Sequence, residues 1–202
     1  MLKKNLNEVT FAFLDVETTG LSARSGGRVC EVAICKRRGQ EQLGDFQFLI
    51  NPGCAIPAEV TGIHGITDAM VADCPGFGKI AAKLLDFIDG TVLVCHNAGF
   101  DMGFIEHELR LAGFRLPESL FVLDTLKAAR KYGGFKSNKL GEIAREIGLS
   151  CDGWHRALAD VKMTEKIFFY FLDKFSREGA GRFEDILALQ FSHRAGAKHE
   201  KK

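Results

Sequence analysis

The chain has 202 residues, of which 46% are hydrophobic, so it is long enough to bury the core of one domain. Its formal net charge of +1 excludes a protein that attracts polyanions through an overall basic field, but not one with local charged patches. No stretch approaches the roughly 18 apolar residues of a membrane span, and the N-terminus has no apolar signal segment. We therefore expect a soluble cytoplasmic protein without a membrane partner.

The first predicted strand ends in two carboxylates. Residues 9–14, V-T-F-A-F-L, form an apolar run that predicts a strand buried on both faces. Because side chains alternate along a strand, Asp15 and Glu17 should point to one side, together with Phe11 and Phe13. Like charges held so close need a counter-charge, and a hard divalent cation is the usual one. The alternative is that both acids only mark the solvated end of a strand.

Two more strands are predicted at 28–36 and 41–50, so the first third of the chain should form an antiparallel meander. The segment T-G-I-H-G-I-T, residues 61–67, places His64 between glycines, which predicts a tight loop. From its residues alone, His64 could equally be a loop histidine without a specific task.

The middle of the chain predicts a helix, a buried strand and a second helix. Residues 76–89 carry the apolar spacing of an amphipathic helix, and residues 91–95 have the fully apolar centre of a central strand. The next helix begins at H-N-A-G-F-D, residues 96–101, and continues through Leu111. Asp101 shares a helix face with Phe104 and Ile105, so it either caps the helix start or serves as a ligand.

A fifth strand is predicted at 120–123, and a short amphipathic helix at 140–149. Between them lies a run with no acidic residue and five basic ones: Lys127, Arg130, Lys131, Lys136 and Lys139. Such a run is commonly a solvated face. Beside a carboxylate site, it could also steer a phosphate backbone.

The last long helix should begin near His155, in W-H-R-A-L-A-D. Asp160 lies on the edge of its apolar stripe, which consists of Ala157, Val161, Thr164, Phe168, Phe171 and Phe175. For His155 to meet Asp160, the histidine should lie in the loop before the helix, because five residues separate them by about 140° around a helix. Beyond residue 177 we expect a terminal helix at 182–191 and a basic tail, giving a division into 1–177 and 178–202.

Four acids thus occupy positions where a lone charge is costly: Asp15, Glu17, Asp101 and Asp160. Oxygen ligands without cysteine favour Mg²⁺ or Mn²⁺ over zinc. Two such ions about 3.5–4 Å apart suit an in-line phosphoryl displacement, which makes phosphodiester hydrolysis the natural chemistry. His155 would suit the general base for water.

Three motifs carry a family resemblance: D-V-E-T-T-G at 15–20, H-N-A-G-F-D at 96–101 and H-R-A-L-A-D at 155–160. In this order and spacing they resemble the motifs of the DEDDh branch of the DEDD (DnaQ-like) 3′–5′ exonuclease superfamily. That branch includes the proofreading epsilon subunit of bacterial DNA polymerase III, ribonuclease T and oligoribonuclease. The resemblance covers roughly residues 9–176, and the segments I-H-G-I-T and L-D-T are also typical of epsilon-like members.

The resemblance implies an α/β fold of the ribonuclease-H-like type, with a mixed five-stranded sheet, its first three strands antiparallel, flanked by helices. It implies a two-metal 3′–5′ exonuclease that releases nucleoside 5′-monophosphates. By motif position, the four acids would hold two Mg²⁺ or Mn²⁺ ions and His155 would remove the proton from water. Further positions match those around the terminal nucleotide in relatives: Thr18, Leu21, His64, Asn97 and Phe100.

The partner implied by the resemblance is a nucleic acid with a free 3′ end, and the similarity to the epsilon subunit favours DNA. An RNA exonuclease like ribonuclease T or oligoribonuclease is the alternative, because the motifs act on phosphate and do not sense the 2′-hydroxyl. A binding module tethered to a DNA polymerase is another, and a homodimer is compatible with the phenylalanines of the last long helix. A Ca²⁺-binding protein is disfavoured, since no EF-hand-like spacing occurs.

Overall fold

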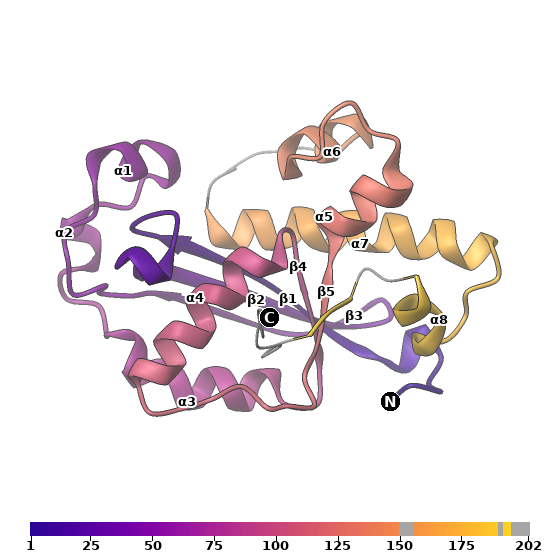
Figure 1. The fold of residues 1–202 in the computed structure, drawn as a ribbon, viewed down its shortest axis with the longest axis horizontal. Helices are drawn as coiled ribbons and strands as arrows, with labels where there is room; N and C mark the ends of the chain where they lie inside the picture. The colour runs from indigo at the N-terminus through magenta and orange to yellow at the C-terminus, as the bar shows by residue number, and fades with distance from the viewer. Residues whose placement is uncertain (150–155, 190–191, 195–202) are drawn as a thin grey trace, which may run out of the picture.

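The computed structural model describes residues 1–149, 156–189 and 192–194, and these form a central mixed β-sheet with helices on both faces (Figure 1). The strands are β1 (Thr10–Thr18), β2 (Val29–Arg38), β3 (Glu41–Leu49), β4 (Val92–Cys95), β5 (Phe121–Asp124) and β6 (Ser192–Arg194). The α-helices are α1 (Ala58–His64), α2 (Asp68–Val71), α3 (Phe77–Ile88), α4 (Ala98–Leu111), α5 (Thr125–Ala128), α6 (Leu140–Glu146), α7 (Ala157–Arg177) and α8 (Phe183–Ala188). Three short turns complete the list: the 3₁₀ turns η1 (Leu6–Glu8) and η2 (Ala23–Ser25), and the π-helical turn η3 (Ala129–Gly133).

The strand order is β3-β2-β1-β4-β5-β6. Strands β1, β2 and β3 are antiparallel neighbours, whereas β1, β4 and β5 run parallel to one another. This confirms the expected mixed sheet with three antiparallel strands at its start. Parallel neighbours need crossover connections, and here α3 and α4 supply them.

A short strand was not expected. Strand β6 pairs antiparallel with β5, in the segment for which we predicted a tail. The sequence there lacks the apolar alternation of a strand, so no pattern indicated it. Its pairing satisfies backbone groups along the outer edge of β5, which is the physical reason for a strand at this place.

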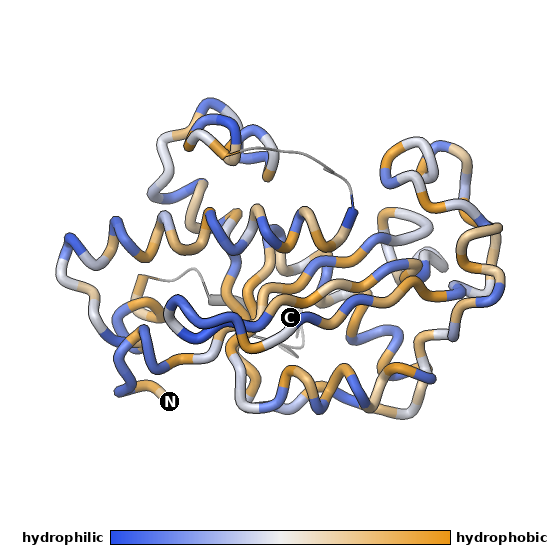
Figure 2. The backbone as a smooth tube through the Cα atoms, turned by 180° about the vertical axis from the view of Figure 1, so that it is seen from behind, coloured by the Kyte–Doolittle hydropathy of each residue, from blue (hydrophilic) through white to orange (hydrophobic). Residues whose placement is uncertain are grey.

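Two hydrophobic layers enclose the sheet. Helix α7 covers one face, where the Phe168 ring centroid lies 4.8 Å from that of Phe11 and 5.6 Å from that of Phe13. Helices α3 and α4 cover the other face. Figure 2 shows hydrophobic residues following one another along the central strands, while the helices alternate between hydrophobic and hydrophilic residues. Both patterns agree with strands buried on two faces and helices buried on one.

Two differences between prediction and structure concern residues of the predicted site. Strand β1 continues through both acids to Thr18, because β2 extends the ladder and places Glu31 opposite Glu17. His64 is not in a loop but is the last residue of α1. The helix ends there because Gly65 adopts the left-handed conformation, with φ of 73°, which a glycine reaches without steric cost.

The N-terminal segment packs against the start of α8 beside the sheet. Residue Phe183 of α8 is fully buried with the α7 layer, and its N–H donates to the Lys4 carbonyl. None of the helices that the structure describes is both long and apolar enough to cross a membrane.

Candidate active site

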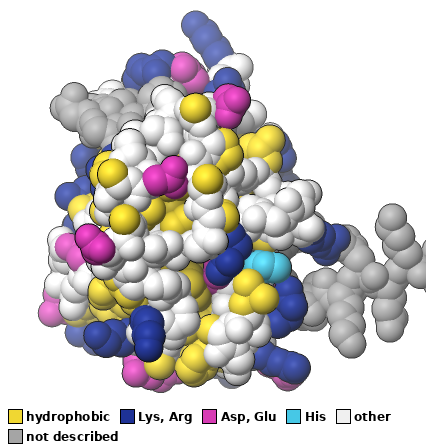
Figure 3. Space-filling model, turned by 90° about the vertical axis from the view of Figure 1, so that its left-hand side faces the viewer, with side chains coloured by type: hydrophobic (Ala, Val, Ile, Leu, Met, Phe, Trp, Pro, Cys, Tyr) yellow, Lys and Arg dark blue, Asp and Glu magenta, His cyan; other side chains and the backbone are white. Residues whose placement is uncertain are grey.

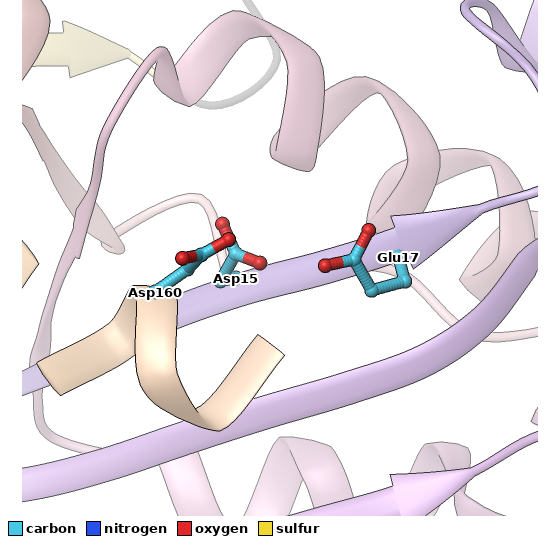
Figure 4. Close-up of side chains that lie close together, drawn as sticks. All are labelled: Asp15, Glu17 and Asp160. Atoms are coloured by element: carbon cyan, nitrogen blue, oxygen red, sulfur yellow. The ribbon is translucent and has the colours of Figure 1, made fainter. Parts of the chain in front are cut away.

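Three of the four predicted acids come together. Asp15 and Glu17 project from β1 and Asp160 projects from the first turn of α7, and their carboxylates face one another (Figure 4). One carboxylate oxygen from each residue lies within 4.8 Å of the other two. The alternation of β1 explains why both of its acids face α7, the side on which Phe11 and Phe13 are packed.

The electrostatics of these carboxyls reflect burial and mutual repulsion. Burial raises the pKa of Asp15 well above its ordinary value, and the neighbouring Asp101, Asp160 and Glu17 raise it further. Burial and Asp160 also raise the pKa of Glu17, to about 8. A positive charge at this point would remove the repulsion and favour the ionised forms.

Asp101 lies next to this group but outside the set of three. It is 2% exposed in the first turn of α4, and burial raises its pKa although backbone hydrogen bonds, one of them from Val16, lower it. The charge of Asp101 raises the pKa of Asp15 more than the charge of Asp160 does. Asp101 lies at a helix start and also beside the carboxylate cluster. Its position is therefore compatible with both predicted roles, as a helix cap and as a ligand.

The donor chemistry of the cluster fits a hard cation. All three residues offer carboxylate oxygens, which Mg²⁺ and Mn²⁺ prefer, and no histidine or cysteine of the described chain belongs to the set. The cluster therefore has the composition expected of such a site.

An ion pair that the sequence did not predict, between a half-exposed arginine and a buried carboxylate, fixes the start of α7. The Arg156 guanidinium donates two hydrogen bonds to Glu31 of β2, with Nε to Oε2 at 3.1 Å and Nη2 to Oε1 at 2.9 Å. The Ala157 N–H donates to the same carboxylate at 3.2 Å. Glu31 is fully buried, and the only sequence signal was a lone acid inside the apolar strand V-C-E-V-A-I-C.

A second pair anchors the other acid-bearing helix to the same strand. Glu108 of α4 is 2% exposed and accepts from Arg28 at 2.8 and 2.9 Å and from the Val29 N–H at 3.1 Å. Helices α4 and α7 are thus both attached to β2, from opposite faces of the sheet. This arrangement holds Asp101 and Asp160 relative to β1.

Thr18 and Leu21, two of the predicted substrate-binding residues, are in very different environments. Leu21 is 91% exposed just after β1, whereas Thr18 is buried and its hydroxyl donates to the Gly20 carbonyl at 2.7 Å. Helices α1 and α2 carry two more exposed hydrophobic residues, Ile63 and Met70. These helices lie at the end of the molecule that faces the viewer in Figure 3, where hydrophobic side chains are dispersed among polar and charged ones.

His64 does not face solvent. It is 3% exposed, its Nδ1 accepts from the Ile66 N–H at 3.0 Å, and its Nε2 lies 3.8 Å from the Cys30 sulfur. A direct contact with a nucleotide would require this side chain to leave its pocket. The sequence could not reveal this burial, because it depends on the packing of α1 against β2.

Asn97 and Phe100 lie at the start of α4. Asn97 is exposed and is the one non-glycine residue of the described chain with positive φ, 74°. Its N–H donates to Asp124, and Phe100 packs against Phe104 with ring centroids 5.0 Å apart. His155, the predicted base, lies outside the described residues.

Residues 12–168 match the model of the exonuclease family RNase_T. The chain belongs to the exonuclease family. Its three carboxylates lie inside the matched segment, so the geometry above is that of an exonuclease domain.

Two curated relatives extend this result. The exonuclease chain is 36% identical over 170 residues to the 3′-5′ exonuclease DinG of Bacillus subtilis, covering 84% of this chain and 18% of the relative. It is 34% identical over 193 residues to a DNA polymerase III subunit epsilon-like protein of Rhodobacter capsulatus, covering 93% of this chain and 27% of the relative. The chain therefore spans only about a fifth to a quarter of the length of these relatives.

The fold has close structural counterparts. The nuclease domain of 3′hExo, a DEDDh family member solved with bound rAMP, superimposes with a TM-score of 0.72 at 18% identity, covering 85% of this chain and 95% of that domain. The ribonuclease-H-like architecture expected from the motifs is thereby confirmed for this exonuclease chain.

Proposed function

We propose that this chain is a metal-dependent 3′–5′ exonuclease that releases nucleoside 5′-monophosphates from the 3′ end of DNA. The observation that carries the proposal is the convergence of Asp15, Glu17 and Asp160 within 4.8 Å on the fold of the exonuclease family. The two curated relatives support the direction of hydrolysis and the choice of DNA through their names.

The four acids hold the metal in this proposal. Asp15, Glu17 and Asp160 would hold one Mg²⁺ or Mn²⁺ ion, and Asp15 together with Asp101 would hold a second. Such ions supply Lewis-acid polarisation of the scissile phosphate and lower the pKa of water. The buried carboxyls contribute a preorganised negative site that is costly without cations, as the raised pKa values of Asp15 and Glu17 indicate.

His155 is the proposed general base. An imidazole nitrogen would take a proton from the attacking water as its oxygen bonds to phosphorus. The P–O bond to the 3′ oxygen of the preceding nucleotide would break, and that oxygen would take a proton from solvent to become the new 3′-hydroxyl. Arg156, the next residue, is attached to Glu31, so the start of α7 is held against β2. If this role is correct, the rate should fall on the acid side with an apparent pKa near 6.5, the ordinary value for histidine.

The terminal nucleotide would lie on the Glu17 side of the cluster. Leu21, 91% exposed, offers an apolar contact for its base, and backbone amides near Glu17 and Thr18 would hold the 3′-hydroxyl. Asn97 and Phe100 would border the same nucleotide, and His64 would support the loop behind it. An enzyme that recognises a 3′-hydroxyl in this way should not start at a 3′-phosphate.

A substrate panel tests the proposal. The purified chain is incubated with single-stranded DNA, duplex DNA with a mismatched 3′ end, RNA and a dinucleotide, each with Mg²⁺, with Mn²⁺ and with chelator. We expect mononucleotide release from DNA with metal only, and none from a 3′-phosphorylated strand. The matched control is Asp15→Asn, which should bind DNA without hydrolysing it.

The outcomes separate the alternatives. Faster release from RNA than from DNA would replace DNA with RNA as the substrate. Binding of DNA without turnover by the unmodified chain would favour a polymerase-associated binding module. Hydrolysis that survives Asp15→Asn, or that continues in chelator, would refute the metal assignment.

A further inference from the structure

A cavity of about 550 Å³ opens beside the carboxylate cluster, and apart from Asp160 and Asn97 its lining residues have no role in the chemistry described above. Eight residues line it: Asp160, His96, Asn97, Leu126, Arg130, Asn138, Lys139 and Leu140. Its volume lies within the range of ligand-binding pockets. The cavity is bounded by α5, η3 and the start of α6, which lie on the α7 side of the sheet in Figure 1.

The charge of the cavity wall is positive away from Asp160. Of the five basic residues between 127 and 139, Arg130 and Lys139 line the cavity, and both are exposed. Lys131 is directed elsewhere, since its ammonium donates to the Leu189 carbonyl and lies over the Tyr132 ring. The basic run is therefore not a uniform solvated face, because two of its residues line the same cavity as Asp160.

The wall of the cavity is held in place by hydrogen bonds. The His96 ring joins β4 to the loop before α6, with Nδ1 2.9 Å from the Thr125 hydroxyl and Nε2 3.0 Å from the Asn138 carbonyl. This bridge fixes the loop that carries Asn138 and Lys139 relative to the cluster. The Asn138 side-chain oxygen is buried, and no hydrogen-bond partner for it occurs among the described residues.

We propose that this cavity binds the backbone phosphates of the nucleotides preceding the scissile bond, with Arg130 and Lys139 as the phosphate contacts. The inference rests on the proposed function and deepens it. If the terminal nucleotide lies on the Glu17 and Leu21 side of the cluster, the rest of the strand leaves on the opposite side, past Asp160, which lines the cavity. A guanidinium and an ammonium there would attract a single DNA strand and set a preference for strands longer than a dinucleotide.

The test compares strand lengths. Arg130→Gln, Lys139→Gln and the double variant are assayed on oligothymidylates of two and twelve nucleotides, with Lys79→Gln/Lys83→Gln as the control. The control removes two equally exposed charges from α3, on the opposite face of the sheet. We expect the double variant to lower the ratio of kcat/KM for the twelve-mer to that for the two-mer by about tenfold, and the control to leave the ratio unchanged.

Salt dependence gives a second readout, because each lost phosphate contact on a single strand reduces the slope of log affinity against log salt by about 0.7. Binding is therefore measured by fluorescence anisotropy with a labelled twelve-mer in chelator, where hydrolysis is absent. For the double variant we expect the slope to fall by about 1.4 relative to the unmodified chain.

These results distinguish failure of the inference from failure of the proposed function. An unchanged length ratio and an unchanged salt slope in a folded double variant would overturn the cavity assignment. A loss of rate that is equal for both lengths would also overturn it, because the residues would then act on the chemistry. An unmodified chain that binds the twelve-mer through Arg130 and Lys139 but never hydrolyses it would support the cavity and refute the exonuclease.

Discussion

Arg156 neutralises Glu31, and this leaves Glu17, its neighbour across the ladder, as the acid available to a cation. Strands β1 and β2 place Glu17 directly opposite Glu31, an unfavourable pairing of like charges. Arg156 and Gln47 both donate to Glu31, and these hydrogen bonds lower its pKa against the effect of burial. The pKa of Glu17 is raised instead, so Glu17 still requires a counter-charge, whereas Glu31 already has one.

Removing the arginine should destabilise the fold. Arg156→Ala leaves Glu31 buried without its main counter-charge. We expect this to lower the free energy of unfolding by roughly 3 kcal/mol. This is the low end of the range for a broken buried pair, because the Arg156 side chain is 41% exposed. Urea denaturation measures this change. In a double-mutant cycle, adding Glu31→Gln to Arg156→Ala should recover part of the loss. Strictly additive effects would contradict a direct interaction.

Asp15→Asn should separate stability from activity. It removes one charge from a group of mutually repelling acids, so the metal-free protein should unfold at a higher temperature than the unmodified chain. Hydrolysis should fall at least roughly 1,000-fold, about 4 kcal/mol in transition-state free energy, since a metal ligand is lost. Thermal melts in chelator and single-turnover assays with Mg²⁺ measure the two effects. A variant that is both less stable and fully active would contradict the site.

Without metal, stability should decrease as the pH rises. The pKa of Glu17 is about 8 in the folded chain and 4.5 ordinarily, so between these values the folded state retains a proton that the unfolded chain has released. Raising the pH through this window therefore favours unfolding. The measurement is a series of thermal melts in chelator, and Glu17→Gln is the control that should flatten the slope.

Added Mn²⁺ should oppose this loss, most strongly at the upper end of the window, where the carboxyls ionise. At a metal concentration roughly 100 times Kd, the gain should reach about 2.7 kcal/mol. Equal stabilisation by Mn²⁺ of the unmodified chain and of Asp15→Asn would show that the cation binds elsewhere.

Leu21 should matter for catalysis but not for folding. Because its side chain is 91% exposed, Leu21→Ala should change the free energy of unfolding by less than about 0.5 kcal/mol. If Leu21 packs against the terminal base, kcat/KM should fall by roughly tenfold. Leu111→Ala, a 54% exposed leucine at the end of α4, is the matched control and should leave kcat/KM unchanged. Equal effects of both variants would remove Leu21 from the substrate site.

Asn97 can be tested for two separate roles. Its left-handed backbone favours asparagine or glycine, so Asn97→Ala should cost about 1 kcal/mol of stability while Asn97→Gly should not. A side-chain contact with the substrate would be lost in both variants, raising KM equally. Thermal melts and steady-state kinetics separate the two. Full activity of Asn97→Gly would assign the residue to backbone conformation alone.

Much of the fold follows from local patterns in the sequence. The apolar runs of β1 and β4 and the spacing of α3 and α7 identify these elements, because period and length distinguish buried strands from amphipathic helices. Strand β6 was not predicted, because its three polar residues show neither pattern. The prediction of a loop at His64 was wrong, because the glycines on either side favoured a turn while the residue ends helix α1.

By itself, the sequence determined that Asp15 and Glu17 leave β1 on one side and that Asp160 lies on the inner edge of a helix, because alternation and helical period are properties of single elements. Only the tertiary structure decided that these carboxylates meet, that Asp101 stays just outside the set, and that Glu31 is taken by Arg156. Distances between elements depend on how helices pack against a sheet. That packing sums many contacts between residues far apart in the chain, and no local pattern records it.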